Sequence, residues 1–211
     1  MAFAALDPAQ AGGATAEEAQ ARTDAFRVGP NAALQLIEAL RAEGGEPLAR
    51  QVFEAAGRRA WIDAPPQEMI PQQAAAALFQ AVRRVIPSRA DLILEDAGRR
   101  TADYLLAHRI PRPAQRALRL LPPRLAIRLL LAALARHAWT FAGSARFIAT
   151  PERGSLGVTL EGNPLATPGC PWHVAVFTRL LQACGAPDVR VTHEECEGRG
   201  HTRCRFEITP A

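Results

Sequence analysis

Four residues in the last third of the chain have side chains that bind metal ions: Cys170, His193, Cys196 and Cys204. Structural zinc sites use about four such ligands, thiolate or imidazole, arranged as a tetrahedron. His193 and Cys196 are three residues apart, and a glycine-bearing turn over 197–201 can bring Cys204 back beside Cys196. Neither cysteine pair has the short spacing of a zinc finger, so the spacing alone leaves both a metal site and plain buried thiols open.

The elements that must position these residues follow from the pattern after residue 143. Two strands, 144–150 and 155–161, are joined by Pro151–Gly154, which is typical of a hairpin. An amphipathic helix over 173–184 ends at Gly185, and strands over 189–194 and 203–209 follow it. Cys170 therefore lies just before the helix, while the other three residues belong to the second hairpin.

The preceding part of the chain has helical periodicity. Helices are predicted over 31–44, 47–57, 71–85, 88–108 and 114–139, the last interrupted at Pro122-Pro123. The predicted fold class is therefore α+β, with N-terminal helices followed by an antiparallel sheet of two hairpins and an intervening helix. We expect a flexible tail over 1–23 and a single domain over 24–211, with a helical part to 140 and a zinc-pinned α+β part from 141.

The segment from Cys170 to Ile208 resembles the C-terminal signature of the four-vinyl-reductase domain family. That signature has a cysteine before a helix, an acidic-x-x-Cys stretch, a glycine turn and Cys-x-Phe-x-Ile, which is Cys204 to Ile208 here. Sensors of this family bind zinc with three cysteines and one glutamate. The resemblance implies a structural zinc on Cys170, Cys196, Cys204 and His193, where His193 stands at the position of the glutamate; Glu194 and Glu195 compete for that corner.

The resemblance also implies a function. The family is named after the reduction of a vinyl group on a chlorophyll precursor and is regarded as a small-molecule-binding module. We therefore expect a tetrapyrrole-binding accessory protein of bacteriochlorophyll biosynthesis, which binds or delivers a vinyl-bearing chlorophyllide with a Mg-tetrapyrrole as its ligand. The alternatives are a vinyl reductase with an external electron donor and a small-ligand sensor or interaction module. Expected partners are other pigment-synthesis enzymes, a second copy of the chain and the surface of the photosynthetic membrane.

Composition limits the remaining choices. The chain has 211 residues, of which 48% are hydrophobic and 22% charged, as in a soluble globular protein. The net charge is +4, and the basic residues are dispersed arginines, so no nucleic-acid partner is expected. The sequence shows neither a signal peptide nor an apolar run long enough to span a bilayer, which predicts a cytoplasmic protein whose cysteines do not form disulfides.

Other residues have two interpretations each. His108, His137 and His173 could each be an axial ligand to a chlorophyll magnesium, but helical histidines are more often only hydrogen-bonded. Arg124, Arg128 and Arg136 form a stripe that could rest on a membrane or bind carboxylates, and a solvated basic face is favoured. The remaining expectations are burial for Cys184 and for the aromatic group of Trp139, Phe141 and Phe147, and solvation for His201.

Overall fold

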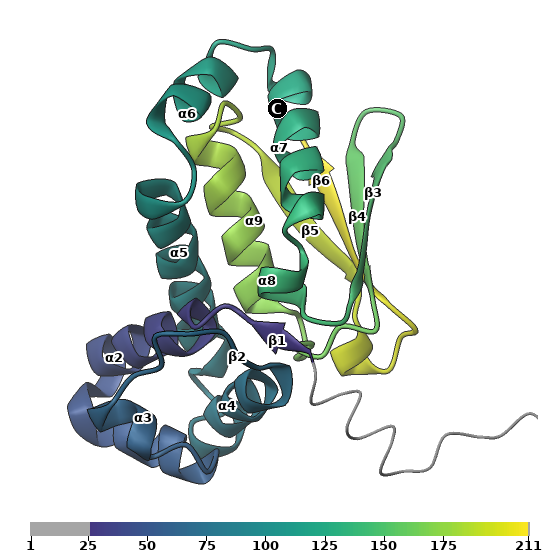
Figure 1. Cartoon of the computed structure of the whole chain (residues 1–211). Helices are drawn as coiled ribbons and strands as arrows, with labels where there is room; N and C mark the ends of the chain where they lie inside the picture. The colour runs from purple at the N-terminus through teal and green to yellow at the C-terminus, as the bar shows by residue number, and fades with distance from the viewer. Residues whose placement is uncertain (1–25, 211) are drawn as a thin grey trace, which may run out of the picture.

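Helices make up most of the first two thirds of the molecule (Figure 1). The computed structural model describes residues 26–210, so the predicted tail over 1–23 lies outside the described residues. The helices are α2 (Asn31–Ala55), α3 (Ala60–Asp63), α4 (Gln72–Val85), α5 (Ala90–His108), α6 (Arg112–Arg119), α7 (Pro123–Arg136) and α8 (Trp139–Ala142). Two short antiparallel strands, β1 (Arg27–Val28) and β2 (Ile70–Pro71), link the start of this part to its middle.

The two helices predicted over 31–44 and 47–57 form one element, α2, with a sharp kink. Gly44 and Gly45 leave the helical conformation at this point, and Gly45 has a φ of 70°. A left-handed backbone angle suits glycine because it has no Cβ. Pro47 then lies in the first turn after the kink, where its missing N–H costs little.

The last third forms a four-stranded antiparallel sheet with one long helix. Its elements are β3 (Arg146–Pro151), β4 (Leu156–Glu161), α9 (Pro171–Ala183), β5 (Arg190–Glu195) and β6 (Cys204–Thr209). The strand order is β3-β4-β6-β5, so the two predicted hairpins lie side by side and pair through β4 and β6. The predicted α+β fold class is confirmed.

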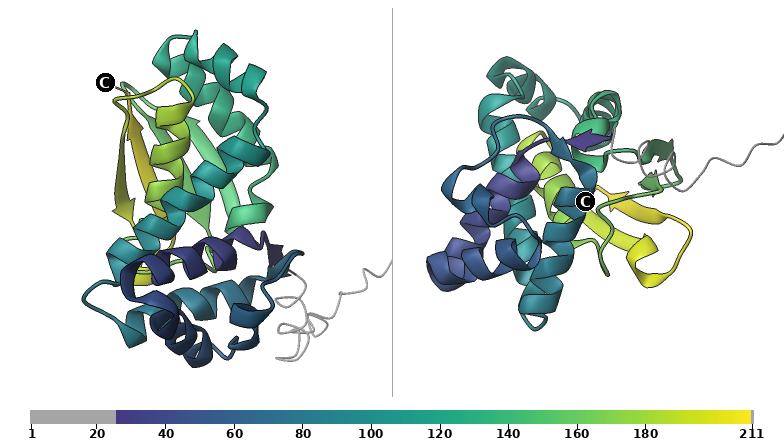
Figure 2. Two further views of the ribbon diagram at one scale, coloured as in Figure 1. Left: turned by 90° about the vertical axis from the view of Figure 1, so that its left-hand side faces the viewer. Right: turned by 60° about the horizontal axis from the view of Figure 1, so that its bottom comes forward.

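Helix α9 covers one face of the sheet, and α5 packs on the other side of α9 (Figure 2). Inward-facing residues of β6 alternate with half-buried ones, as expected for a strand with one face in the core. Phe177 of α9 meets Phe206 of β6 edge to face, with ring centroids 5.3 Å apart. The core continues from this contact into the helical part, since buried residues from Val28 to Ile208 form one cluster.

Helix α7 lies beside β3, and one prediction for the residues that follow it is wrong. Leu125 and Leu129 of this helix are about half exposed, at 43% and 48%. Ala126, Ile127, Leu130, Leu131 and Leu134 supply the buried face of the helix. Trp139 was expected in the core and is 54% exposed, whereas its neighbour Phe141 is buried.

Among residues 26–210, no helix combines the length and apolar character needed to cross a bilayer.

Candidate metal centre

The predicted quartet comes together at one end of the sheet. One ligand atom from each of Cys170, His193, Cys196 and Cys204 can be chosen such that all four lie within 4.8 Å of one another. Cys170 precedes α9, His193 lies in β5, Cys196 follows β5 and Cys204 opens β6. The three cysteines are buried and His193 is half-buried. Residues 34 positions apart in the sequence thus share one site.

Cys170 reaches the cluster through an unusual backbone conformation. Its φ of 42° is the only positive φ of a residue other than glycine in the described chain. Left-handed angles are disfavoured for residues with a Cβ, so the surroundings must hold this one. The backbone N–H of Cys170 donates to the carbonyl oxygen of Thr167 at 2.8 Å, and Pro171 then starts α9 directly. This turn directs the thiol toward the second hairpin.

A β-bulge in β5 positions the histidine. Pairing with β6 runs His193 to Phe206 and then skips to Glu195 with Arg205, so Glu194 is the extra residue. The His193 ring stacks on the Phe206 ring, with centroids 4.6 Å apart and an interplanar angle of 20°. The bulge lets His193 and Cys196 point to the same place although they are three residues apart.

A carboxylate that sequence analysis missed fastens the two loops of the site together. Glu197 accepts hydrogen bonds from the backbone N–H groups of Gly162 and Asn163, both at 2.8 Å. The Asn163 side chain amide in turn lies 3.6 Å from the sulfur of Cys204. Nothing in the sequence pattern indicates that the loop at Asn163 touches the cysteines.

Close packing at Gly198 also holds two loops of the site together. A Cβ at this position would lie 2.7 Å from the backbone nitrogen of Pro168 and 2.9 Å from the Cα of Thr167. Only glycine therefore allows the 197–199 turn to press against the loop that leads to Cys170. The thiol of Cys196 donates to the carbonyl oxygen of Thr167 across this contact, at 3.2 Å.

A hydrogen bond links the thiols of Cys170 and Cys204, whose sulfur atoms lie 3.6 Å apart. The Cys170 thiol donates a hydrogen bond to the sulfur of Cys204, and this bond is the main reason why the pKa of Cys204 falls to about 4. The same bond, together with burial and the nearby cysteines, raises the pKa of Cys170. A site that favours one thiolate without a metal is prepared for a cation, which would stabilise all of its thiolates.

The spacing of the sulfur atoms fits a tetrahedral ion. Ligands at about 2.3 Å from a tetrahedral zinc leave their sulfur atoms about 3.8 Å apart. Here the Cys170 sulfur lies 3.8 Å from that of Cys196 and 3.6 Å from that of Cys204. A disulfide needs about 2.05 Å, so these contacts are not disulfides. Both ring nitrogens of His193 are buried without a hydrogen-bond partner, as a ligating imidazole would be before its metal arrives.

The alternative ligands have other contacts. Glu194 pairs with Arg205 at 2.8 Å, and Glu195 accepts hydrogen bonds from two of the three guanidinium nitrogens of Arg203, at 2.8 and 2.9 Å. His201 is exposed, with Nδ1 3.1 Å from the carbonyl oxygen of Cys196. Cys184 is buried at the end of α9, as expected of a thiol outside the cluster.

The three histidines considered for a chlorophyll magnesium are far from equivalent. His173 is 1% exposed and packs among Trp172, Phe177 and Phe206, so a macrocycle cannot reach it in this structure. His108 and His137 are exposed at the ends of α5 and α7.

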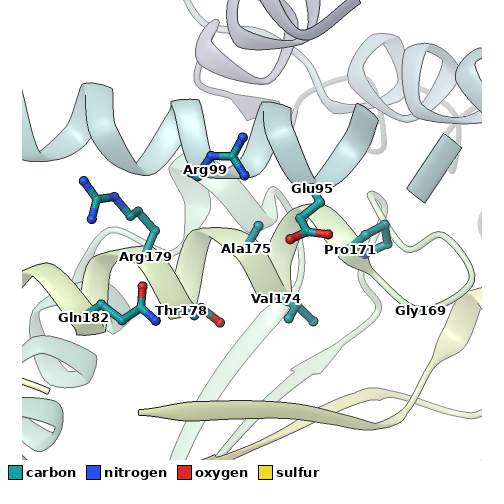
Figure 3. Close-up of a pocket in the computed structure, with 9 residues that line it drawn as sticks. All are labelled: Glu95, Arg99, Gly169, Pro171, Val174, Ala175, Thr178, Arg179 and Gln182. Atoms are coloured by element: carbon teal, nitrogen blue, oxygen red, sulfur yellow. The ribbon is translucent and has the colours of Figure 1, made fainter. Parts of the chain in front are cut away.

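A groove of about 490 Å³ runs between α5 and α9 (Figure 3). Val174 and Ala175 of α9 line its apolar part, and Glu95 and Arg99 of α5 overhang it. Arg99 pairs with Asp96, and Arg179 on the opposite wall pairs with Asp103 at 2.7 Å. The groove thus offers an apolar strip with a charged rim.

The fold is that of the H-NOX proteins. A Cs H-NOX variant carrying 4-cyano-L-phenylalanine matches 86% of this chain and 96% of its own, with a TM-score of 0.60 and 13% identity. An unliganded Fe(II) H-NOX variant from K. algicida matches 87% of this chain and 97% of its own, with a TM-score of 0.59 and 11% identity. At such identity the likeness concerns the fold alone.

Sequence comparison identifies the family. The bacteriochlorophyll synthase 23 kDa chain of Cereibacter sphaeroides is 41% identical over 194 residues, which cover 88% of this chain and 92% of the relative. Its counterpart in Rhodobacter capsulatus is 38% identical, covering 89% of each chain. The chain belongs to the family of the bacteriochlorophyll synthase 23 kDa chain. This confirms the relation to proteins of bacteriochlorophyll synthesis that the sequence predicted. No family model matches the chain.

Proposed function

We propose that this chain is a tetrapyrrole-binding accessory protein of bacteriochlorophyll biosynthesis, built around a structural zinc ion. It would bind or deliver a vinyl-bearing chlorophyllide precursor for reduction by another enzyme. The observation that carries the proposal is the 41% identity to a bacteriochlorophyll synthase chain over 92% of that relative. The relative is described as one chain of a synthase, which supports other pigment-synthesis enzymes as partners.

The fold supports a tetrapyrrole as the ligand. The solved H-NOX structures with this fold include one that was used to study the function of heme distortion, with a TM-score of 0.54. A chlorophyllide is a flat macrocycle of the same chemical kind as heme. The α5–α9 groove adds an apolar strip beside arginines, which would suit the macrocycle and its carboxylate.

The zinc in this proposal is structural. Cys170, Cys196, Cys204 and His193 would fill all four positions of a tetrahedral ion and leave none for water or substrate. Such an ion would tie the turn after β5 and the start of β6 to the start of α9. That arrangement favours a binding role over catalysis at the metal.

The proposal is tested by titrating purified, zinc-loaded protein with divinyl and monovinyl chlorophyllide, followed by absorbance without reductant. Saturable binding with a shifted pigment band is expected. Folded protein that binds neither pigment would contradict the proposal. Turnover of the divinyl substrate by this protein and a nicotinamide donor alone would replace the accessory role with that of a reductase.

A pair of variants tests whether the groove holds the pigment. Val174→Glu places a charge on the apolar strip, whereas Leu92→Glu places the same charge at an exposed position of α5. Burial of an unpaired carboxylate beside an apolar ligand is costly, so Val174→Glu should weaken pigment binding at least tenfold, by about 1.4 kcal/mol or more. Leu92→Glu should bind as the parent does.

The metal is tested by removing one ligand. Cys196→Ser should reduce zinc content from about one ion per chain to near zero, and should lower the free energy of unfolding by about 4 kcal/mol or more. Cys184→Ala, at a buried cysteine outside the cluster, should keep its zinc. Metal analysis after gel filtration and urea unfolding measure both. Equal zinc content in the two variants would refute the site.

A further inference from the structure

One continuous stretch of the chain carries positive charge without any acidic residue. Between Arg109 and Pro151 there are eight arginines and no Asp or Glu. The stretch forms α6, α7, α8 and β3, which lie at one end and along one side of the molecule (Figure 1). Elsewhere in the described chain arginine and acidic residues are interspersed. The positive charge of this stretch is therefore local, and the expectation of dispersed arginines is wrong for it.

The same stretch carries most of the large apolar side chains that face solvent. The described chain has six exposed large hydrophobic residues, and four of them are Leu120, Leu125, Leu129 and Trp139. Leu120, in the turn between α6 and α7, is 86% exposed. Exposing a leucine side chain to water is unfavourable in free energy, and a cluster of exposed apolar residues marks an interaction surface.

On α7 the two kinds of residue form one face. At about 100° per residue, Leu125, Leu129, Ala132 and Arg136 fall within about 60° of one another. Arg124 and Arg128 flank this strip on one side. A strip of leucines with an arginine at its end and further arginines along one edge is typical of a helix that lies in the plane of a membrane surface.

Helix α6 extends the charge next to this face. Arg112, Arg116 and Arg119 line a shallow recess of about 300 Å³ together with Gln115. Gln115 is 9% exposed, and its amide donates to the carbonyl oxygens of Leu106 and Ile110, which fixes α6 on the end of α5. The recess is therefore a rigid basic surface whose guanidinium groups suit the oxygens of a phosphate.

The arginines of this surface are available for an anionic partner. The ion pairs formed within residues 26–210 include neither Arg112 nor Arg116 of α6. The same holds for Arg128 and Arg136 of α7. Each could thus bind a phosphate without first breaking a bond to a carboxylate.

We propose that the face formed by α6, α7 and Trp139 docks on the surface of a bilayer that contains anionic lipids. Leu120, Leu125 and Leu129 would enter the boundary between headgroups and acyl chains, and the arginines would pair with lipid phosphates. Tryptophan is favoured at that depth because its ring is apolar and its N–H is polar. The proposal goes beyond pigment binding and does not depend on it.

Charge argues against a second copy of the chain as the occupant. In a two-fold dimer the same surface patch faces itself, so arginines would meet arginines across the contact. A bilayer with anionic headgroups instead offers negative charge and an apolar layer together. The face therefore fits a lipid surface better than it fits itself.

Vesicle flotation tests the docking. Wild-type protein is mixed with vesicles of phosphatidylcholine alone or with about 30% phosphatidylglycerol, at low and at high salt. Each arginine near an anionic surface contributes a factor of about five, so Arg128→Gln/Arg136→Gln should weaken binding to the anionic vesicles about 30-fold. Leu125→Ser/Leu129→Ser should weaken it at least about tenfold. High salt should weaken wild-type binding as well.

Matched controls lie at the opposite end of the molecule. Arg58→Gln/Arg84→Gln removes the same charge near α3 and α4, and Leu92→Ser removes an equally exposed leucine from α5. Both should bind vesicles as the wild type does. Quenching by brominated lipids should be weaker in Trp139→Phe than in the wild type.

Three results would overturn the proposal. One is wild-type protein that stays in solution with anionic vesicles at low salt. Another is vesicle binding that both α7 double variants retain. The third is self-association in analytical ultracentrifugation that Leu125→Ser/Leu129→Ser abolishes, without any vesicle binding, because the face would then belong to a second copy.

Discussion

At the scale of single residues, His193 stands at the corner of the cluster where the resemblance to the four-vinyl-reductase domain family implies a glutamate. Both imidazole and carboxylate bind zinc, at about 2.0–2.2 Å. The His193 ring is held by stacking on Phe206 and not by a hydrogen bond, so its position depends on shape. The position of His193 is therefore the one at which another zinc ligand can most easily replace the residue present.

His193→Glu should accordingly keep the metal, while His193→Ala should weaken zinc binding by about 10–100-fold. The reason is that glutamate supplies an oxygen from the same backbone position and alanine supplies nothing. Competition with a zinc-binding dye measures both affinities. If His193→Ala binds as tightly as the parent, the fourth ligand is another group.

A second histidine should make stability depend on pH. Burial among aromatic rings lowers the pKa of His173 to about 4, from about 6.5 in an unfolded chain. Between these two values the unfolded chain binds a proton that the folded one does not. Stability should therefore decrease as pH falls from about 6.5 to 4, by up to about 3 kcal/mol.

The His173→Phe variant isolates this contribution, since phenylalanine has a similar shape and no proton to bind. Its urea stability should depend less on pH than that of the zinc-loaded parent over the same window. Zinc release at acid pH affects both proteins and cancels in the comparison. Parallel curves would show that His173 binds a proton equally in the folded and the unfolded chain.

At the scale of elements, the close approach of α5 and α9 places the first ligand. A Cβ on Gly98 of α5 would overlap the carbonyl oxygen of Trp172 and lie 3.0 Å from the Cβ of Ala175. The start of α9, and with it Cys170, is thus positioned by a glycine on a distant helix. Gly98→Ala should lower the free energy of unfolding by about 1–3 kcal/mol.

Urea unfolding of Gly98→Ala, with Arg99→Ala as its control, measures this effect. Arg99 is the next residue and faces the groove, so its truncation should change stability by less than about 0.5 kcal/mol. Zinc affinity should fall in Gly98→Ala only. Unchanged stability would mean that α9 can shift away from α5 at little cost.

Much of this architecture could be predicted, for reasons that differ between elements. Strands β4 and β6 alternate clearly, and the cysteines and histidine belong to the few residue types that bind zinc. Helix α7 was harder, because leucines occur all around it and only tertiary contacts decide that Leu130 is buried and Leu129 exposed. Contacts such as Glu197 with the Asn163 backbone join two irregular loops and have no periodic signal.

At the scale of the whole molecule, the helical part and the sheet should unfold together. The single domain over 24–211 is a prediction from the sequence, and within residues 26–210 one core cluster includes residues of both parts. Zinc-loaded protein should therefore give one transition, with the same urea midpoint by far-UV circular dichroism and by tryptophan fluorescence. Trp61 in α3 and Trp172 in α9 report on the two parts. Separate midpoints would divide the chain into two domains.

The acid-free stretch has a consequence for how this protein meets other molecules. Its eight arginines exceed the net charge of +4 of the whole chain, while the rest of the described residues carry 16 arginines against 17 acidic groups. The protein is thus nearly neutral over most of its length and strongly positive at one end, which makes it an electric dipole. In the field of a negative surface it would rotate before contact and arrive with α6 and α7 leading.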